Sequence, residues 1–125
     1  MAKKLAAIRG ATCCDNTKEE ITKYVCQMCN QIMDENNLLP EDLVSIQFTV
    51  TKDITVLNPA TALRKGPMKY DMSQVALFCS QEAEIEGGME YVIRVLVHAY
   101  MPEFVSKHNV YINGGERLRP DFYNK

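Results

Sequence analysis

Hydrophobic and polar residues recur with two different periods along the chain, and each period predicts a different kind of element. Over residues 17–35 apolar side chains recur every three to four positions, which is the spacing of an amphipathic helix. Thr17 and Glu20 have the capping-box spacing that satisfies backbone N–H groups at a helix start, and Asn36 and Asn37 are stop signals. The sequence therefore predicts one long helix over residues 17–35.

Strands are predicted where the period falls to two, or where short apolar runs end at turn residues. The alternation is clearest over residues 44–51, and apolar runs at 4–12, 74–85 and 109–113 predict further strands. The stretch 87–100 also fits an apolar helix face. Its β-branched residues and the glycine pair that opens it favour a strand.

A short helix completes the predicted order of elements. Asn58 followed by Pro59 is typical of a helix start, and Gly66 closes that segment. The order strand, helix, strand, short helix and three strands indicates an α+β fold with a five-stranded mixed sheet, one long amphipathic helix and short helical turns. Since one helix covers only one face of such a sheet, we expect self-association to bury the other face.

Length and composition limit the possible function classes. At 125 residues, with 46% hydrophobic and 24% charged residues, the chain is expected to form a single domain over residues 1–125. A net charge of −2 without a run of Lys or Arg offers no concentrated basic surface for nucleic acid or a membrane. The apolar run near the start is too short for a signal peptide or a membrane span, so we expect a cytoplasmic protein.

The five cysteines indicate reduced thiols rather than a disulfide framework, because we find no export signal. Cys26 and Cys29 form a C-x-x-C pair, but they fall about two turns inside the predicted helix, away from the N-terminal dipole that activates redox thiols. His98 and His108 do not supply a well-spaced second pair of zinc ligands. Structural thiols are therefore favoured over a redox or metal site, and we expect no metal and no cofactor.

Arginine is the candidate chemical group of this sequence. Arg9 and Arg94 lie on predicted strands and Arg119 follows the last one, whereas the long helix carries lysines. On its strand, Arg94 lies on the face opposite to Ile93 and Val95. A guanidinium binds carboxylates in a planar, two-pronged way, so these arginines are candidates to line one anion-binding pocket. From residue types alone, the alternative that each pairs with a local Asp or Glu stays open.

Six short motifs carry a resemblance to a known family. They occur in the family's order and at nearly its spacing, with the long helix between the first and the second. The motifs are IRGAT at residues 8–12, NPA with Arg64 at 58–64, CSQE at 79–82, GG with IRV at 87–95, VYI at 110–112 and LRPD at 118–121. With this set the sequence resembles the AroH-class chorismate mutases, the monofunctional mixed-sheet type rather than the all-helical type.

The resemblance implies an isomerase that rearranges chorismate to prephenate in the shikimate pathway, on the way to phenylalanine and tyrosine. It implies a homotrimer of pseudo-α/β-barrel form, with active sites at the subunit interfaces and no cofactor. Arg94 is implied as the catalytic cation at the ether oxygen of the substrate, and Glu82 as the acceptor for the ring hydroxyl. The implied substrate-binding residues are Arg9, Tyr111, Arg119, Arg64, Cys79, Leu118, Ala60, Thr61 and Phe78.

Some positions depart from the family pattern, and other functions remain open. Asn58 and Thr61 stand where the family usually has an aromatic and a basic residue, which removes one hydrophobic wall and one cation. Residues 116–125 are expected to form a mobile tail that Arg119 closes over the pocket. A trimeric module that binds a small carboxylate without turnover, and a deaminase-like trimeric hydrolase, are the alternative classes. In the simplest alternative, Glu82 is a solvated loop acid and Tyr111 a sheet-face aromatic.

Overall fold

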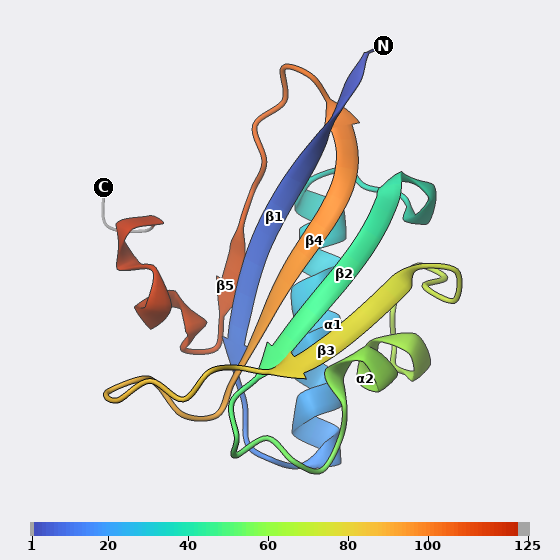
Figure 1. The fold of residues 1–125 in the computed structure, drawn as a ribbon. Coiled ribbons are helices and arrows are strands. Elements are labelled where there is room, and N and C mark those ends of the chain that lie inside the picture. Colours follow the sequence, from blue (N-terminus) through green and yellow to red (C-terminus); the bar gives the residue numbers. More distant parts are fainter. Residues whose placement is uncertain (1, 123–125) are drawn as a thin grey trace.

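The computed structural model describes residues 2–122 and contains one five-stranded sheet. The strand order across the sheet is β3-β2-β4-β1-β5 (Figure 1). The strands are β1 (Lys3–Cys13), β2 (Leu43–Val50), β3 (Ala76–Gln81), β4 (Val92–Pro102) and β5 (Val110–Ile112). The helices are α1 (Lys18–Glu35) and α2 (Pro59–Lys65), with 3₁₀ turns at Pro40–Asp42, Gly115–Leu118 and Pro120–Phe122.

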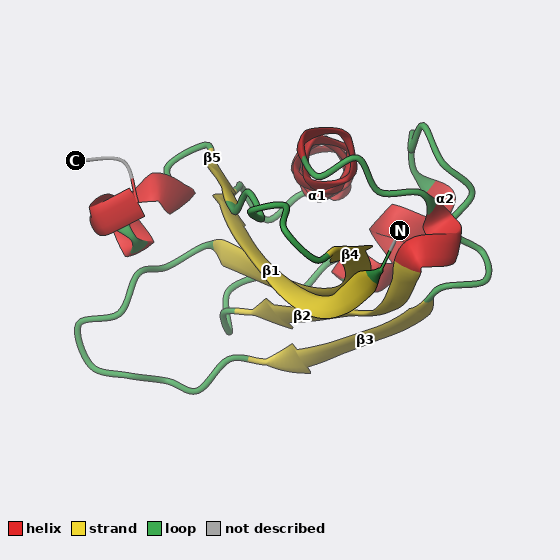
Figure 2. Ribbon diagram, turned by 90° about the horizontal axis from the view of Figure 1, so that it is seen from above, coloured by secondary structure: helices red, strands yellow, loops and turns green. Residues whose placement is uncertain are grey.

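The sheet is mixed, and its two faces differ. β4 runs antiparallel between β1 and β2, whereas β5 joins β1 and β3 joins β2 in parallel. Seen from above, α1 and α2 lie on the same side of the sheet (Figure 2). Among residues 2–122, no helix covers the opposite side of strands β1 to β4. The predicted α+β fold is confirmed, and one sheet face is left uncovered in the single chain.

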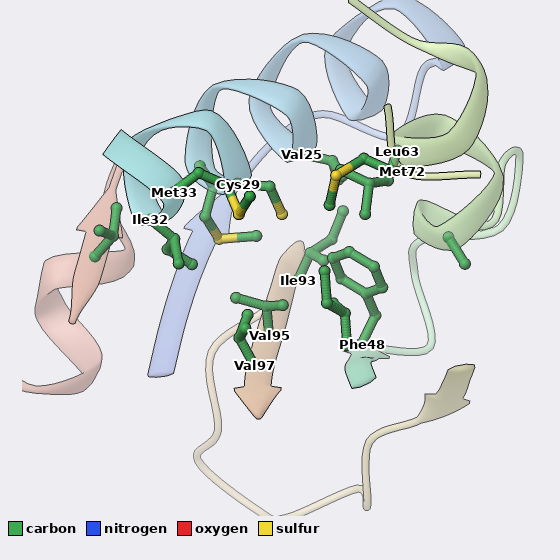
Figure 3. Packing of buried hydrophobic residues seen from close by; sticks show 14 of the residues in the cluster. Val25, Cys29, Ile32, Met33, Phe48, Leu63, Met72, Ile93, Val95 and Val97 are labelled. Atoms are coloured by element: carbon green, nitrogen blue, oxygen red, sulfur yellow. The ribbon is translucent and has the colours of Figure 1, made fainter. Parts of the chain in front are cut away.

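The core lies between α1 and the covered face of the sheet. The buried residues of α1 follow the predicted helical spacing, and the facing residues of β2 and β4 alternate with exposed ones. Each large apolar side chain buried in this way contributes about 1.5–3 kcal/mol of transfer free energy. Figure 3 labels part of this core, namely Val25, Cys29, Ile32, Met33, Phe48, Leu63, Met72, Ile93, Val95 and Val97.

Side-chain caps fix where both helices begin. Thr17 Oγ1 accepts a hydrogen bond from the Glu20 N–H at 3.1 Å, as the capping pattern predicts. Asn58 Oδ1 accepts from the Ala60 N–H at 2.8 Å, and Pro59 fills the first helical position. Asn58 is therefore used locally as a cap, which is a structural reason for a residue that departs from the family pattern.

The main differences from the sequence expectation lie at β3, at β4 and after β5. The strand predicted over 74–85 is limited to β3, because only residues 76–81 pair with β2. β4 begins at Val92, later in the chain than the predicted stretch 87–100, and it continues to Pro102, because Met101 and Pro102 still pair with the start of β1. The segment after β5 forms two 3₁₀ turns up to residue 122, and residues 123–125 of the predicted tail lie outside the described part of the chain.

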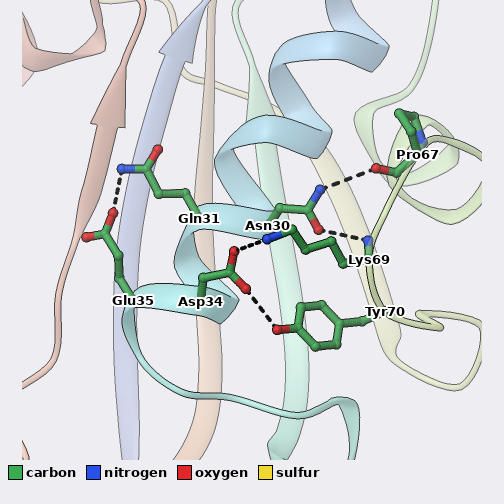
Figure 4. A network of polar contacts seen from close by, with 7 residues as sticks. All are labelled: Asn30, Gln31, Asp34, Glu35, Pro67, Lys69 and Tyr70. Atoms are coloured by element: carbon green, nitrogen blue, oxygen red, sulfur yellow. Dashed lines mark hydrogen bonds and ion pairs between the residues drawn. The ribbon is translucent and has the colours of Figure 1, made fainter.

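The outer face of α1 holds the connection between α2 and β3. Asn30 accepts from the Lys69 N–H at 3.0 Å and donates to the Pro67 carbonyl oxygen at 3.3 Å (Figure 4). Asp34 forms an ion pair with Lys69 and accepts from the Tyr70 hydroxyl at 2.8 Å. The hydrogen bond from Lys69 is the main cause that lowers the pKa of Asp34. These contacts fasten the segment from which α2 projects.

The cysteines are part of the packing. All five are free thiols, and Cys26 and Cys29 are each only 2% exposed. Burial raises the pKa of Cys26 from its ordinary value of 9.0 to about 11, and it also raises the pKa of Cys29. Both thiols are thus protonated at neutral pH, which suits a core role better than redox chemistry.

Two further observations concern the described residues as a group. Within residues 2–122, no three His, Cys, Asp or Glu side chains are grouped in a way that could hold a metal ion. A helix that is both long enough and apolar enough to cross a bilayer is also absent from this part of the chain.

Candidate active site

The uncovered face of the sheet carries the candidate residues in rows that cross the strands. Directly paired residues point to the same side of a sheet, so the strand register defines these rows. One row consists of Arg9, Leu96, Gln47 and Phe78, and the next of Ala11, Arg94, Thr49 and Ser80. Because the buried neighbours Val95 and Phe48 face α1, Arg9 and Arg94 project from the uncovered side.

Arg94 faces Glu82. Arg94 Nε lies 2.8 Å from Glu82 Oε1, and Thr49 Oγ1 donates to the same oxygen at 2.9 Å. The Glu82 N–H donates to the Val50 carbonyl oxygen at 2.8 Å, which extends the contact between β2 and β3 by one residue. Glu82 is therefore fixed at both its backbone and its side chain, and it is more than a solvated loop acid.

Arg94 and Glu82 are open to water within the single chain. The Arg94 side chain is 47% exposed and that of Glu82 is 26% exposed, so apolar neighbours do not shield the pair from water within one chain. The reason is the strand period, because Ile93 and Val95 turn to the core. A dry environment for Arg94 requires a further surface over this face.

A pocket of about 310 Å³ surrounds this ion pair. The lining carries a net positive charge, because its ionised side chains belong to three arginines and one glutamate. The lining residues are Arg9, Gly10, Gln47, Thr49, Glu82, Arg94, Val95, Leu96, Tyr111 and Arg119. Five residues that the sequence named as candidates, far apart along the chain, therefore meet in one pocket. Such a site suits an anion with more than one carboxylate.

Tyr111 closes the pocket on the side of β5. It is 7% exposed and pairs with Ala11 in the parallel contact between β5 and β1. Leu118 packs against the small apolar cluster formed by Tyr111, Ala11 and Val92. Leu118 also lines a neighbouring hollow that shares Glu82 and Arg94 with the pocket. The first of the two C-terminal turns thus supports Tyr111 from outside.

Arg119 forms a two-pronged ion pair with Asp121. Its Nε donates to Asp121 Oδ1 at 3.0 Å and its Nη2 donates to Oδ2 at 2.6 Å. This hydrogen bonding is the main cause that lowers the pKa of Asp121. The C-terminal turns and the loop after β3 both lie toward the same end of the sheet (Figure 1).

Sequence reasoning missed Gln47, Thr49 and Gly10. Gln47 and Thr49 lie on the polar face of the alternating strand β2, so the period of two could have placed them beside Arg94 once the strand pairing was known. Gly10 matters by its lack of a side chain, since a Cβ there would lie 2.7 Å from the Val110 carbonyl oxygen. A larger residue at position 10 would therefore disturb the contact between β1 and β5.

Leu118 lies beside this pocket, and the structure does not bring the five remaining candidates to it. Three of them lie on α2, on the covered side of the sheet: these are Ala60, Thr61 and Arg64. Phe78 is 63% exposed on the edge strand β3, one row from Arg94. Cys79 packs against the core, and burial raises its pKa. Within one chain these residues do not line the pocket around Arg94.

Comparison with known proteins identifies the family. A family model described as chorismate mutase type I matches residues 5–122. The chain belongs to this family. It is 35% identical to chorismate mutase AroH of Bacillus subtilis (strain 168) over 121 residues, which cover 94% of this chain and 91% of that protein. It is 34% identical to chorismate mutase AroH of Thermus thermophilus over 118 residues, covering 91% of this chain and 93% of the relative.

A solved structure agrees with these relatives. The chorismate mutase from Clostridium thermocellum superposes with a TM-score of 0.81 at 36% sequence identity, covering 90% of this chain and 99% of that chain. The prediction of an AroH-class chorismate mutase fold and of an isomerase is confirmed at the level of the family. The roles of individual residues and the assembly state stay predictions.

Proposed function

We propose that the protein rearranges chorismate to prephenate in the pocket that contains the Arg94–Glu82 pair. The observation that carries this proposal is the convergence of Arg9, Arg94, Tyr111 and Arg119, from four separate segments, around a fixed glutamate. The reaction is unimolecular and needs positioning and charge rather than a nucleophile. Membership of the chorismate mutase type I family supports the same reaction.

Positioning is the first task that the pocket is proposed to perform. Chorismate is a flexible dianion that reacts only when its enolpyruvyl side chain folds over the ring. We propose that Arg9 binds one carboxylate in a two-pronged way, and that Tyr111 donates to the enolpyruvyl carboxylate with Arg119 beside it. When both carboxylates are held, the substrate is bound in its reactive conformation, which it rarely adopts in solution. This lowers the entropic part of the barrier.

Electrostatic stabilisation is the second task. As the C–O bond breaks ahead of C–C bond formation, negative charge develops on the ether oxygen and positive charge on the ring. We propose that Arg94 faces this oxygen, where a fixed cation stabilises the transition state more than the ground state. The Glu82 contact through Nε fixes the plane of the Arg94 guanidinium. Since Thr49 and Arg94 both bind Oε1 of Glu82, we assign its Oε2 to the ring hydroxyl of the substrate.

A homotrimer of pseudo-α/β-barrel form is the assembly that we propose. Several large apolar side chains remain exposed on the uncovered face: these are Leu5 at 55%, Tyr100 at 48% and Phe78 at 63%. Single soluble chains rarely leave such a surface open. Packing three chains over these faces would exclude water from Arg94 and raise the strength of its field.

The proposed assembly gives a role to the candidate residues that lie outside the pocket of their own chain. We propose that Ala60, Thr61, Arg64 and Phe78, with Cys79 beside them, complete the pocket of a neighbouring protomer. The contacts between α1 and residues 67–69 hold α2 in place for that purpose. We further expect a cytoplasmic enzyme of phenylalanine and tyrosine biosynthesis that requires no cofactor.

The test is a direct assay of turnover. Loss of chorismate absorbance with the purified protein, together with acid conversion of prephenate to phenylpyruvate, is expected for the unaltered chain and is expected to collapse in Arg94→Ala. Saturable binding of chorismate without turnover would contradict the proposal and indicate a carboxylate-binding module. Turnover of an imine substrate instead would indicate a deaminase-like hydrolase.

A further inference from the structure

The C-terminal turn brings a carboxylate of the chain itself to an arginine of the pocket. Asp121 receives two parallel hydrogen bonds from Arg119, at 3.0 Å and 2.6 Å. This fork is the geometry in which a guanidinium binds carboxylates in general. Asp121 thus occupies Arg119 in the same way as a carboxylate of a bound ligand.

A second cation of the pocket acts on the same carboxylate. The positive charge of Arg9 adds to the larger effect of Arg119 in lowering the pKa of Asp121. Both arginines line the pocket of about 310 Å³. The Asp121 carboxylate therefore lies in the field of two of the three arginines available to a dianion, and it is ionised at neutral pH.

We propose that Asp121 is an internal competitor for Arg119, which a substrate carboxylate displaces when it enters the pocket. The inference rests on the proposed function, because it takes Arg119 as a substrate-binding residue. Asp121 then sets the apparent affinity of the pocket: each substrate that binds must replace both hydrogen bonds to Arg119, and the 3₁₀ turn Pro120–Phe122 must shift relative to it.

The exposure of the pair makes this exchange feasible. The side chain of Asp121 is 60% exposed and that of Arg119 is 31% exposed. Exposed ion pairs are weak because water and salt screen them, so a ligand carboxylate can take the place of Asp121 at small cost. The small size of the pair interaction also limits the expected effect of removing it to a factor of a few.

The experiment compares chorismate turnover in the complete chain with four variants. Asp121→Asn keeps the shape of the side chain and removes its charge. Glu103→Gln is the matched control, because it removes the same charge from an exposed residue of the loop after β4, outside the pocket. Arg119→Ala and the double variant of Arg119→Ala with Asp121→Asn show whether the effect passes through Arg119.

We expect Asp121→Asn to lower KM by about two- to five-fold, in keeping with the strength of an exposed ion pair, with kcat changed by less than about two-fold. The gain is expected to shrink at high salt and to vanish in the Arg119→Ala background. Glu103→Gln is expected to leave KM unchanged. An unchanged or higher KM in Asp121→Asn overturns the inference, and so does an equal decrease in Glu103→Gln or a persisting effect without Arg119.

Failure of the proposed function is distinguishable from failure of this inference. If the unaltered chain does not turn over chorismate, the proposed function fails, and the dissociation constant of chorismate measured by calorimetry replaces KM. Tighter binding of chorismate by Asp121→Asn then still supports competition for Arg119, whereas equal or weaker binding overturns it.

Discussion

The two faces of strand β4 show how one segment serves two purposes. Ile93, Val95 and Val97 are at most 3% exposed and pack under α1, whereas Arg94 between them is exposed on the other side. The covered face is apolar and closely packed. The uncovered face carries the ion pair, the pocket and several exposed apolar side chains.

The difference between the two faces indicates which property of the protein a substitution is expected to change. Residues on the covered face act on stability, because each one replaces water by packed neighbours. Under the proposed function, residues in the pocket of the uncovered face act on the chemical step, because their charges face the substrate and not the core. Substitution of the adjacent residues Ile93 and Arg94 is therefore expected to have different effects, on stability for Ile93 and on activity for Arg94.

The largest expected effect is on the covered face. Phe48 is fully buried, so Phe48→Ala is expected to lower the free energy of unfolding by about 3–5 kcal/mol. The matched variant is Phe78→Ala, one strand away but 63% exposed. We expect it to change the stability of a single protomer by less than about 0.5 kcal/mol. Denaturant unfolding followed by circular dichroism measures both.

The dependence of the unfolding free energy on protein concentration distinguishes a side chain buried within one chain from a side chain buried between chains. If the uncovered faces pack together in a trimer, the effect of Phe78→Ala on the apparent free energy of unfolding is largest at high protein concentration and shrinks as the protein is diluted, because the stabilisation by association is lost when the chains dissociate. An equal loss in both Phe variants, independent of concentration, would contradict the assignment of Phe78 to an exposed face.

The next effect concerns catalysis at Arg94. Arg94→Gln keeps a polar side chain and removes the charge, and it is expected to lower kcat by at least about 100- to 1,000-fold, with little change in the thermal midpoint. Tyr100→Phe is the control, since Tyr100 lies on the same face of β4 outside the pocket. Steady-state kinetics and a thermal melt suffice, and a wild-type kcat in Arg94→Gln would remove Arg94 from the chemical step.

The covered face was predictable from the sequence because burial leaves a period. The helical spacing of α1 and the alternation of β2 each report which side chains turn inward. The same period of two places Arg94 on the face opposite to Ile93 and Val95. The sequence did not reveal its partner, because Glu82 is one of three closely spaced glutamates. The backbone bond to Val50 singles it out in the structure.

A smaller effect is expected at Arg119. Arg119→Ala removes charge-assisted hydrogen bonds to a substrate carboxylate, so kcat/KM is expected to fall by about 10- to 150-fold and more than kcat does. Arg117→Ala is the matched control, because Arg117 donates to the Gly114 carbonyl oxygen at 3.1 Å and does not line the pocket around Arg94 of about 310 Å³. A loss confined to kcat would instead place Arg119 in the chemical step.

The C-terminal segment shows what sequence patterns could not predict. A tail was expected after β5, but the two 3₁₀ turns have no apolar period that would announce them. The pairing of Arg119 with Asp121 is local and depends on the turn geometry alone. Likewise, no pattern within one chain tells whether α2 completes the pocket of a neighbouring protomer, as we propose. These features depend on geometry and assembly, which periodicity does not encode.

The smallest expected effect is a pH dependence that belongs to the covered side. Cys26 donates from Sγ to the Ala62 carbonyl oxygen at 3.5 Å, and burial raises its pKa from 9.0 to about 11. In the unfolded chain the thiol loses its proton at lower pH than in the folded protein, so unfolding releases a proton and rising pH favours unfolding. The contribution of Cys26 is thus complete below about pH 9 and is lost as the pH rises towards 11.

Cys26→Ala is expected to show a constant offset in unfolding free energy between pH 6 and 8, and a shallower decline than wild type above pH 9. Parallel curves across the whole range would mean that Cys26 ionises alike in both states, and that the thiol lies closer to water than the packing under α2 indicates.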